Sequence, residues 1–115
     1  MTPTIAAHGT PAVSRGQVWW ADLGLSEKKR LVVVSNNQRN RNLRDVVGIY
    51  VTTKPKPDMP SIARFSAGEV GPAECWVLAD QFWQIHKKHL VERIGALTPG
   101  QMLRVDEALR AALGL

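Results

Sequence analysis

The stretch Lys28–Thr53, KKRLVVVSNNQRNRNLRDVVGIYVTT, contains a basic run, an apolar run, a loop rich in Asn and Arg, and a second apolar run that ends in two threonines. The run Leu31–Val34 is bounded by charge on one side and by polar residues on the other, and β-branched side chains dominate it. This pattern is typical of a buried strand. Because a buried strand is held rigidly, the polar residues beside it are fixed in place, and we expect the chemistry of the chain to lie there.

Positive charge is concentrated in the same part of the sequence. Residues 28–56 hold eight Lys or Arg residues and one Asp, a local balance of +7, whereas the whole chain carries a net charge of +5. A local basic field attracts polyanions and raises their encounter rate. Asn, Gln and Arg side chains between these cations can contact bases or phosphates. We therefore favour nucleic acid as the partner over a basic face that only keeps the protein soluble.

Length and composition limit the other possibilities. A chain of 115 residues is expected to form one domain. Its single cysteine, Cys75, excludes an internal disulfide and is interpreted as a small buried thiol. No apolar run approaches the ~18 residues of a membrane helix. Residues 1–14 lack Lys and Arg and are interpreted as a flexible tail rather than a secretory signal, so the domain is predicted over 15–115 and the location is expected to be cytoplasmic.

Hydropathy patterning predicts a mainly β fold. The adjacent residues Trp19 and Trp20 are expected to point to opposite faces of their strand, one into the core and one outward. Three prolines in residues 54–60 mark a loop, and residues 86–90 are compatible with one helical turn. Strands are predicted at residues 17–23, 31–35, 46–52, 61–66, 75–79 with a continuation over 81–85, and 93–96.

The clearest helix is predicted at the C-terminal end of the sequence. Thr98 suits the N-cap, Pro99 suits the first helical position, and Gln101 completes a pattern like a capping box. An apolar stripe recurs at helical spacing and should pack on the sheet. This stripe consists of Met102, Val105, Leu109, Ala112 and Leu113.

Most catalytic constellations are absent from the sequence. His86 and His89 have no third ligand at a suitable spacing, so a zinc site is not expected. The sequence has no glycine-rich phosphate loop, GxSxG turn or HExxH pair. What remains is a set of Arg, Lys, Thr, Ser and Asn side chains near strand ends, which are suited to stabilising charge on a phosphate.

The order of several sequence blocks resembles the MazF/PemK toxin family from about Arg15 to Leu115. The blocks are RGQVWWADLG, KKRLVVVSNN, VGIYVTT, a proline-containing loop, VLADQ, IGALTP and a closing amphipathic segment that ends in RAALGL. The resemblance implies a mainly β, α+β fold: an SH3-like small barrel with a C-terminal helix. It also implies a homodimeric toxin of a type II toxin–antitoxin module, an endoribonuclease that cuts single-stranded RNA without metal or another cofactor and that a cognate antitoxin silences.

The resemblance also implies catalytic positions. The family's arginine opens the second strand in an Arg-Pro pair, and direct alignment places Lys29 on that arginine and Arg30 on the proline. A one-residue gap would place Arg30 on the arginine instead. We favour Arg30, because a guanidinium can hold two phosphate oxygens and stays charged. The family's catalytic threonine or serine falls on Thr52, and the implied reaction is attack of the RNA 2′-hydroxyl on the adjacent phosphate, giving 2′,3′-cyclic phosphate and 5′-hydroxyl ends.

Further residues are expected to contact RNA. Asp80 and Gln81 match an Asp-Gln pair of the family, but Leu78 stands where some members have an arginine, so their acid–base pair does not transfer whole. Trp19, Trp20, Trp76, Phe82 and Trp83 are stacking candidates, although core packing is the commoner fate of aromatics. The predicted RNA-binding residues are Lys28, Ser35, Asn36, Asn37, Arg39, Arg41, Thr53, Lys54, Asp80 and Gln81.

Two other functions stay open. A gyrase-binding toxin of the CcdB type would share the fold, but the end RAALGL does not resemble the C-terminal aromatic end that such a toxin needs. A non-catalytic nucleic-acid-binding module is the second, because the Lys29/Arg30 register and Leu78 depart from the family pattern. Cutting of RNA by the purified protein separates an enzyme from both.

Overall fold

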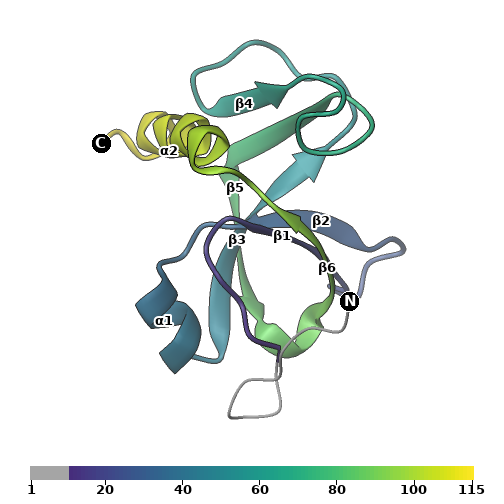
Figure 1. Cartoon of the computed structure of the whole chain (residues 1–115), viewed down its shortest axis with the longest axis vertical. Coiled ribbons are helices and arrows are strands. Elements are labelled where there is room, and N and C mark those ends of the chain that lie inside the picture. Colours follow the sequence, from purple (N-terminus) through teal and green to yellow (C-terminus); the bar gives the residue numbers. More distant parts are fainter. Residues whose placement is uncertain (1–10) are drawn as a thin grey trace.

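A computed structural model describes residues 11–115 and contains six antiparallel strands and a C-terminal helix (Figure 1). The strands lie in the order β4-β5-β3-β2-β1-β6, so β4 and β6 form the two edges of one strongly bent sheet. This architecture confirms the predicted fold class. The elements are β1 (Gln17–Ala21), β2 (Lys29–Val33), α1 (Asn37–Asn42), β3 (Asp45–Thr52), β4 (Ile62–Phe65), β5 (Cys75–His86), the 3₁₀ turn η1 (Lys87–His89), β6 (Leu90–Ala96) and α2 (Pro99–Leu113).

The sheet buries apolar side chains on both faces. Neighbouring residues of a strand point to opposite sides, so Val18 of β1 enters one core cluster, with Met102 and Val105 of α2, while Trp19 enters the other, with Leu31 of β2. Trp19 is fully buried and Trp20 is half-buried, which confirms the prediction that the adjacent tryptophans diverge. Two cores of this kind fix the strands from both sides.

Strand boundaries differ from the predictions mainly at β2, β5 and β6, and β6 begins at Leu90 rather than at residue 93. β2 begins at Lys29 and ends at Val33, whereas the apolar run predicted residues 31–35. Backbone pairing with β1 and β3 extends the strand into the basic run, which hydropathy alone does not reveal. β5 is one strand of 12 residues with an irregularity opposite Ile49 and Tyr50, rather than two segments. The edge strand β4 and the turn η1 confirm their predictions.

The segment after β2 is a short helix, so the prediction of an Asn/Arg-rich loop was wrong there. Asn36 caps α1, because its side-chain oxygen accepts a hydrogen bond of 2.8 Å from the backbone N–H of Arg39. Asn40 is buried at 1% exposure and bonds back to Ser35. Helix α1 has no apolar periodicity, and the Asn36 cap and the buried Asn40 amide stabilise it instead.

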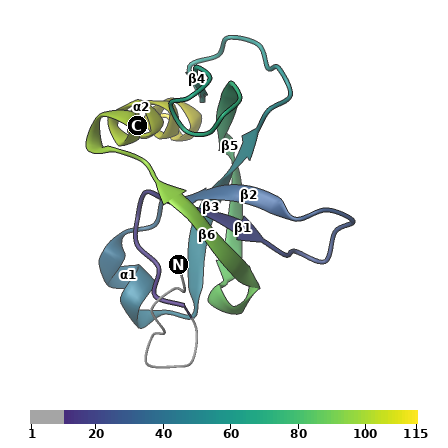
Figure 2. The ribbon, with the colours of Figure 1, turned by 45° about the vertical axis from the view of Figure 1, so that its right-hand side comes forward.

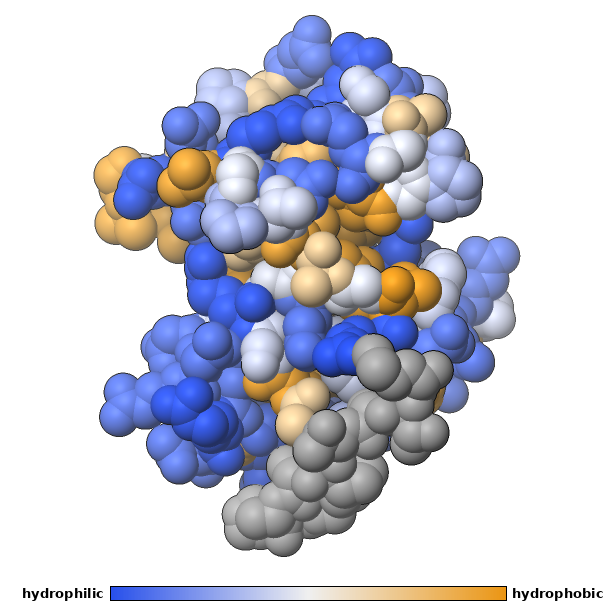
Figure 3. Space-filling view, viewed as in Figure 1, coloured by the Kyte–Doolittle hydropathy of each residue, from blue (hydrophilic) through white to orange (hydrophobic). Residues whose placement is uncertain are grey.

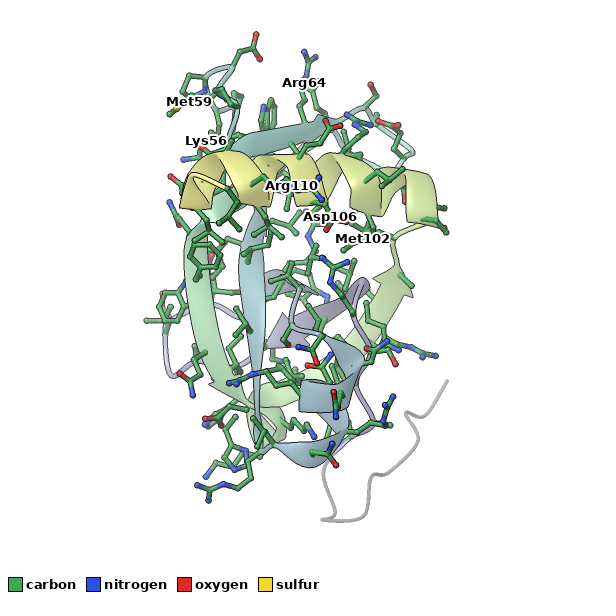
Figure 4. All side chains as sticks on the ribbon, turned by 90° about the vertical axis from the view of Figure 1, so that its left-hand side faces the viewer. Lys56, Met59, Arg64, Met102, Asp106 and Arg110 are labelled. Atoms are coloured by element: carbon green, nitrogen blue, oxygen red, sulfur yellow. The ribbon has the colours of Figure 1, made fainter. Side chains whose placement is uncertain are left out.

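Helix α2 begins as predicted, with a complete capping box between Thr98 and Gln101 and with Pro99 in its first turn. Figure 4 shows Met102 and Asp106 on the side of α2 that faces the sheet, and Asp106 pairs with Arg15 at 2.5 Å. The predicted apolar stripe of α2 was wrong at one residue. Leu113 is 56% exposed because the helix passes the end of the sheet, and Ala108 is buried in addition to Met102 and Val105.

One side chain from before residue 15 packs in the core. Val13 is 6% exposed and belongs to the second core cluster, with Trp19 and Leu90. The tail was predicted over residues 1–14, of which 1–10 lie outside the described residues. Within residues 11–115, neither helix is long and apolar enough to cross a membrane.

Candidate functional site

A polar groove lies where β1, β2 and β3 meet the loop before β2 and the loop after β3. It encloses about 410 Å³. Four of its residues are cations and one is a carboxylate, so its field is positive. We call it the basic groove; it is lined by Trp20, Glu27, Lys28, Lys29, Arg30, Val51, Thr52, Thr53 and Lys54.

Lys29 and Arg30 point to opposite faces of β2. Arg30 pairs across the sheet with Trp20 and Val51, and its guanidinium carbon lies 6.0 Å from the centre of the Trp20 ring. The ammonium of Lys29 lies 6.0 Å from the centre of the Tyr50 ring. This divergence is what alternation along a strand predicts. Both residues line the groove, but they approach it from different sides of the sheet.

Thr52 ends β3 on the side of Lys29. The β2–β3 pairing ends at Arg30 and Val51, and alternation beyond that pair puts Lys29 and Thr52 on the face of the sheet opposite to Arg30. The Thr52 hydroxyl oxygen accepts a hydrogen bond of 3.1 Å from the backbone N–H of Lys54. A hydroxyl that already accepts from an amide keeps its own hydrogen for another acceptor. Thr52 is therefore arranged to donate a hydrogen bond into the groove.

The predicted RNA-binding residues of the Asn/Arg-rich segment lie elsewhere. Ser35, Asn36, Asn37, Arg39 and Arg41 flank or form α1, at the opposite end of β2 from Lys29. In Figures 1 and 2, α1 and the loop between β1 and β2 lie on opposite sides of the molecule. The basic segment 28–56 thus forms two separate positive regions rather than one.

Three of these polar side chains have structural partners. The Ser35 hydroxyl donates to the Asn40 side-chain oxygen at 2.5 Å and accepts from the Val47 N–H at 3.0 Å. Asn36 caps α1, and the Asn37 side-chain oxygen accepts from the Arg15 N–H at 2.6 Å. Their hydrogen-bonding groups hold the turn between β2 and β3.

Asp80 and Gln81 are exposed at the irregular part of β5 and do not line the basic groove. Leu78, at the family's arginine position, is 5% exposed and pairs with Tyr50 and Ile62. It is therefore a core residue.

Three groove residues were not among the predicted catalytic or RNA-binding positions: Trp20, Val51 and Glu27. Trp20 was one of five stacking candidates, and only the β1–β2 pairing places it beside Arg30; Val51 was predicted only as part of a strand. Glu27 lies in the loop before β2, which has no periodicity to place it.

Burial shifts the pKa of two side chains on the sheet, Cys75 and Tyr50. Burial raises the pKa of the Cys75 thiol, and the nearby Arg30 guanidinium opposes part of that rise. Cys75 is thus the buried thiol expected from the sequence. Burial also raises the pKa of Tyr50, the ring beside Lys29. Within residues 11–115 no three His, Cys, Asp or Glu side chains gather as a metal site would require.

Comparison with known proteins shows which family and which solved structures the chain resembles. Residues 14–113 match a family model described as the PemK-like, MazF-like toxin of type II toxin–antitoxin system. The chain is 39% identical over 101 residues to endoribonuclease MazF4 of Mycobacterium tuberculosis, covering 88% of this chain and 92% of that relative, and equally similar to endoribonuclease MazF1 of Mycobacterium bovis. A solved mycobacterial endoribonuclease, in complex with its cognate antitoxin, superposes with a TM-score of 0.81 at 36% identity, covering 90% of this chain and 97% of that one.

Proposed function

The chain belongs to the PemK-like, MazF-like toxin family of type II toxin–antitoxin systems, and we propose that it acts by cutting single-stranded RNA in the basic groove. It is an endoribonuclease toxin, as its relatives are. The observation that carries the assignment to the groove is the position of Thr52 among four cations. Phosphate is the group that such a set of donors recognises.

The proposed reaction is a transesterification that uses the RNA's own 2′-hydroxyl. The 2′-oxygen forms a bond to the adjacent phosphorus, the bond from phosphorus to the 5′-oxygen breaks, and the 5′-oxygen takes up a proton. The products are a 2′,3′-cyclic phosphate and a 5′-hydroxyl end. The proton of the 2′-hydroxyl passes to water or to Glu27, the carboxylate of the groove. DNA lacks the 2′-hydroxyl and should remain intact.

Within this reaction, we propose that Lys29 and Thr52 stabilise the negative charge that develops on the phosphorane. Negative charge on the phosphate oxygens grows as the 2′-oxygen attacks, and donors aimed at that position lower the barrier most. Register places Lys29 and Thr52 on one face of the β2–β3 pair. Arg30, favoured by the chemistry of guanidinium groups, extends from the opposite face beside Trp20. Geometry therefore supports Lys29 over Arg30 for the reacting phosphate.

The remaining groove residues would hold the RNA backbone. Lys28 and Lys54 add charge on either side of Lys29 and Thr52, and Thr53 adds a hydroxyl. Each cation that neutralises a phosphate releases a counterion, which favours binding. No step of this scheme requires a metal or another cofactor.

We also propose a cognate antitoxin and a second copy of the chain as partners, in the cytoplasm. An acidic, partly disordered antitoxin segment would be attracted by the basic groove. Apolar side chains remain exposed on β6 and α2, among them Val91 at 46%, Leu103 at 64% and Leu113 at 56%. Figure 3 shows an apolar patch at the C-terminal end of α2. Such surfaces are typical of contacts with other chains.

Incubation of the purified protein with single-stranded RNA in excess chelator tests the function. We expect discrete cuts with cyclic-phosphate ends, loss of cutting in Lys29→Met, and retained cutting in the exposed control Lys88→Met. If cutting were lost in Arg30→Met but retained in Lys29→Met, the catalytic cation would be Arg30 rather than Lys29. Intact RNA over varied substrates would overturn the proposal and favour a gyrase-binding or non-catalytic role.

A further inference from the structure

A second cavity lies behind the basic groove, between β1, β6 and the loop of residues 69–72. It encloses about 230 Å³, and Arg30 lines both this cavity and the groove. The guanidinium reaches the loop, since a Cβ added at Gly71 would lie 3.4 Å from the Arg30 Nη1 nitrogen. Arg30 therefore connects a site for the RNA backbone to a separate, narrower space.

The guanidinium of Arg30 has unused hydrogen-bonding capacity. Its Nε is buried without a hydrogen-bond partner, and no carboxylate within residues 11–115 lies at salt-bridge distance from it. Beside it lies the Trp20 ring, whose centre is 6.0 Å from the guanidinium carbon. A buried donor without a partner carries a desolvation cost that a ligand with suitable acceptors would remove.

The same cavity holds an acceptor group in a fixed position. Glu69 lines it, and both carboxylate oxygens are anchored: one accepts from the Ser66 N–H at 2.7 Å and the other pairs with Arg104 at 3.3 Å. A carboxylate has about four acceptor sites, so Glu69 can accept further hydrogen bonds while these anchors hold it.

Apolar side chains make up much of the remaining cavity lining. They belong to Val70, Pro72, Ile94 and Leu97. A ligand for this space must combine an apolar body with acceptors for Arg30 and donors for Glu69. A free phosphate does not fit this description, because Glu69 would repel it.

We propose that this cavity binds a guanine base of the RNA, beside the phosphate held in the basic groove. Guanine carries the O6 and N7 acceptors on one edge, which match the paired donors of an arginine. Its N1–H and N2–H₂ donors match a carboxylate. Adenine offers a donor where guanine has O6, so Arg30 would oppose it. The inference rests on the proposed function and adds to it the base that the enzyme selects.

Binding of mononucleotides tests the cavity without any cleavage. We expect 3′-GMP to change the fluorescence of the folded protein, since Trp20 touches Arg30, and to bind at least about tenfold more tightly than 3′-AMP. Arg30→Met and Glu69→Gln should each reduce this preference by at least about tenfold. Lys88→Met, which removes an exposed cation that does not line the cavity, is the control and should retain it.

Mapping of cut sites on a random RNA pool supplies the second readout. We expect wild type to require a guanine beside the cut, and Arg30→Met to cut with that requirement relaxed. Equal binding of 3′-GMP and 3′-AMP, or an unchanged guanine requirement in Arg30→Met, would overturn the inference. The inference would also be overturned if Arg30→Met changed the oligomeric state of the protein but left the base preference intact, because a second copy of the chain, not a base, would then occupy the cavity. Preferential 3′-GMP binding by a protein that cuts no RNA would refute the proposed function alone.

Discussion

At the scale of single residues, two adjacent cations have separate surroundings. Lys29 lies beside Tyr50 and on the same face of the sheet as Thr52, whereas Arg30 lies beside Trp20 and reaches Gly71. Alternation along a strand makes this division unavoidable once β2 starts at Lys29. Sequence alignment alone treats the two as competitors for one role. In the fold they can serve the phosphate and the base separately.

The Thr52 hydroxyl provides a residue-scale prediction. Thr52→Val removes the donor while preserving shape, and we expect the cleavage rate to fall by about 10²–10³-fold, the usual cost of one transition-state donor. Thr52→Ser keeps the hydroxyl and is expected to stay within about tenfold of wild type. Single-turnover cleavage of a defined RNA measures both. Equal rates for the Val and Ser variants would exclude a role for the hydroxyl.

Asn40 should be essential for stability rather than for binding RNA. Its amide pairs with the Ser35 hydroxyl and carbonyl while almost fully buried. Asn40→Ala leaves those groups without partners, and we expect the free energy of unfolding to fall by about 1–3 kcal/mol in urea titrations. Asn40→Asp keeps the acceptor but buries a carboxylate oxygen against the Ser35 carbonyl oxygen, so it should be at least as unstable as Asn40→Ala. No change in either variant would contradict this account of the turn.

At the scale of elements, the sequence predicts best where one local pattern decides the structure. The capping residues fixed the start of α2, and alternation fixed the opposite faces of Trp19 and Trp20. Helix α1 was missed because a buried amide and a cap replace apolar periodicity. Of the predicted site, Lys28, Lys29, Arg30, Thr52, Thr53 and Lys54 come together in the groove, but the α1 residues do not, since separation along β2 is set by strand pairing.

The capping box of α2 supplies an element-scale prediction. Thr98 accepts from the Gln101 N–H at 3.2 Å, and the Gln101 side chain accepts from the Thr98 N–H at 2.9 Å. Thr98→Ala should cost about 1 kcal/mol of stability, visible as a lower thermal midpoint, while Thr98→Ser should cost little. An Ala variant as stable as wild type would mean that packing on β4 and β5 alone determines the start of the helix.

At the scale of the whole molecule, positive charge occupies two opposite regions. The basic groove holds Lys28, Lys29, Arg30 and Lys54, and the surroundings of α1 hold Arg39 and Arg41. A strand of RNA bound at the groove would reach α1 only by running along the sheet. The salt dependence of binding therefore reports which region the RNA occupies.

We expect the double variant Lys28→Met/Lys54→Met to flatten the salt dependence of RNA affinity. Each phosphate contact on single-stranded nucleic acid contributes about −0.7 to the slope of log K against log salt, so the slope should decrease in magnitude by about 1.4. Fluorescence anisotropy with labelled RNA at several salt concentrations measures it. The surface variant Lys88→Met should keep the wild-type slope. A double variant with that same slope would place the RNA away from the groove.

The pairing of β1 with β6 has a consequence for synthesis on the ribosome. β1 emerges early, but its partner on one side is the last strand of the sheet, and Leu97 then bonds to Gly16. Pairings between distant segments form late, after the chain between them is available. A nascent toxin should therefore remain protease-sensitive, and harmless to the RNA being translated, until β6 is exposed. Proteolysis of chains arrested before and after Ala96 would reveal this delay, and protection of the shorter chains would exclude it.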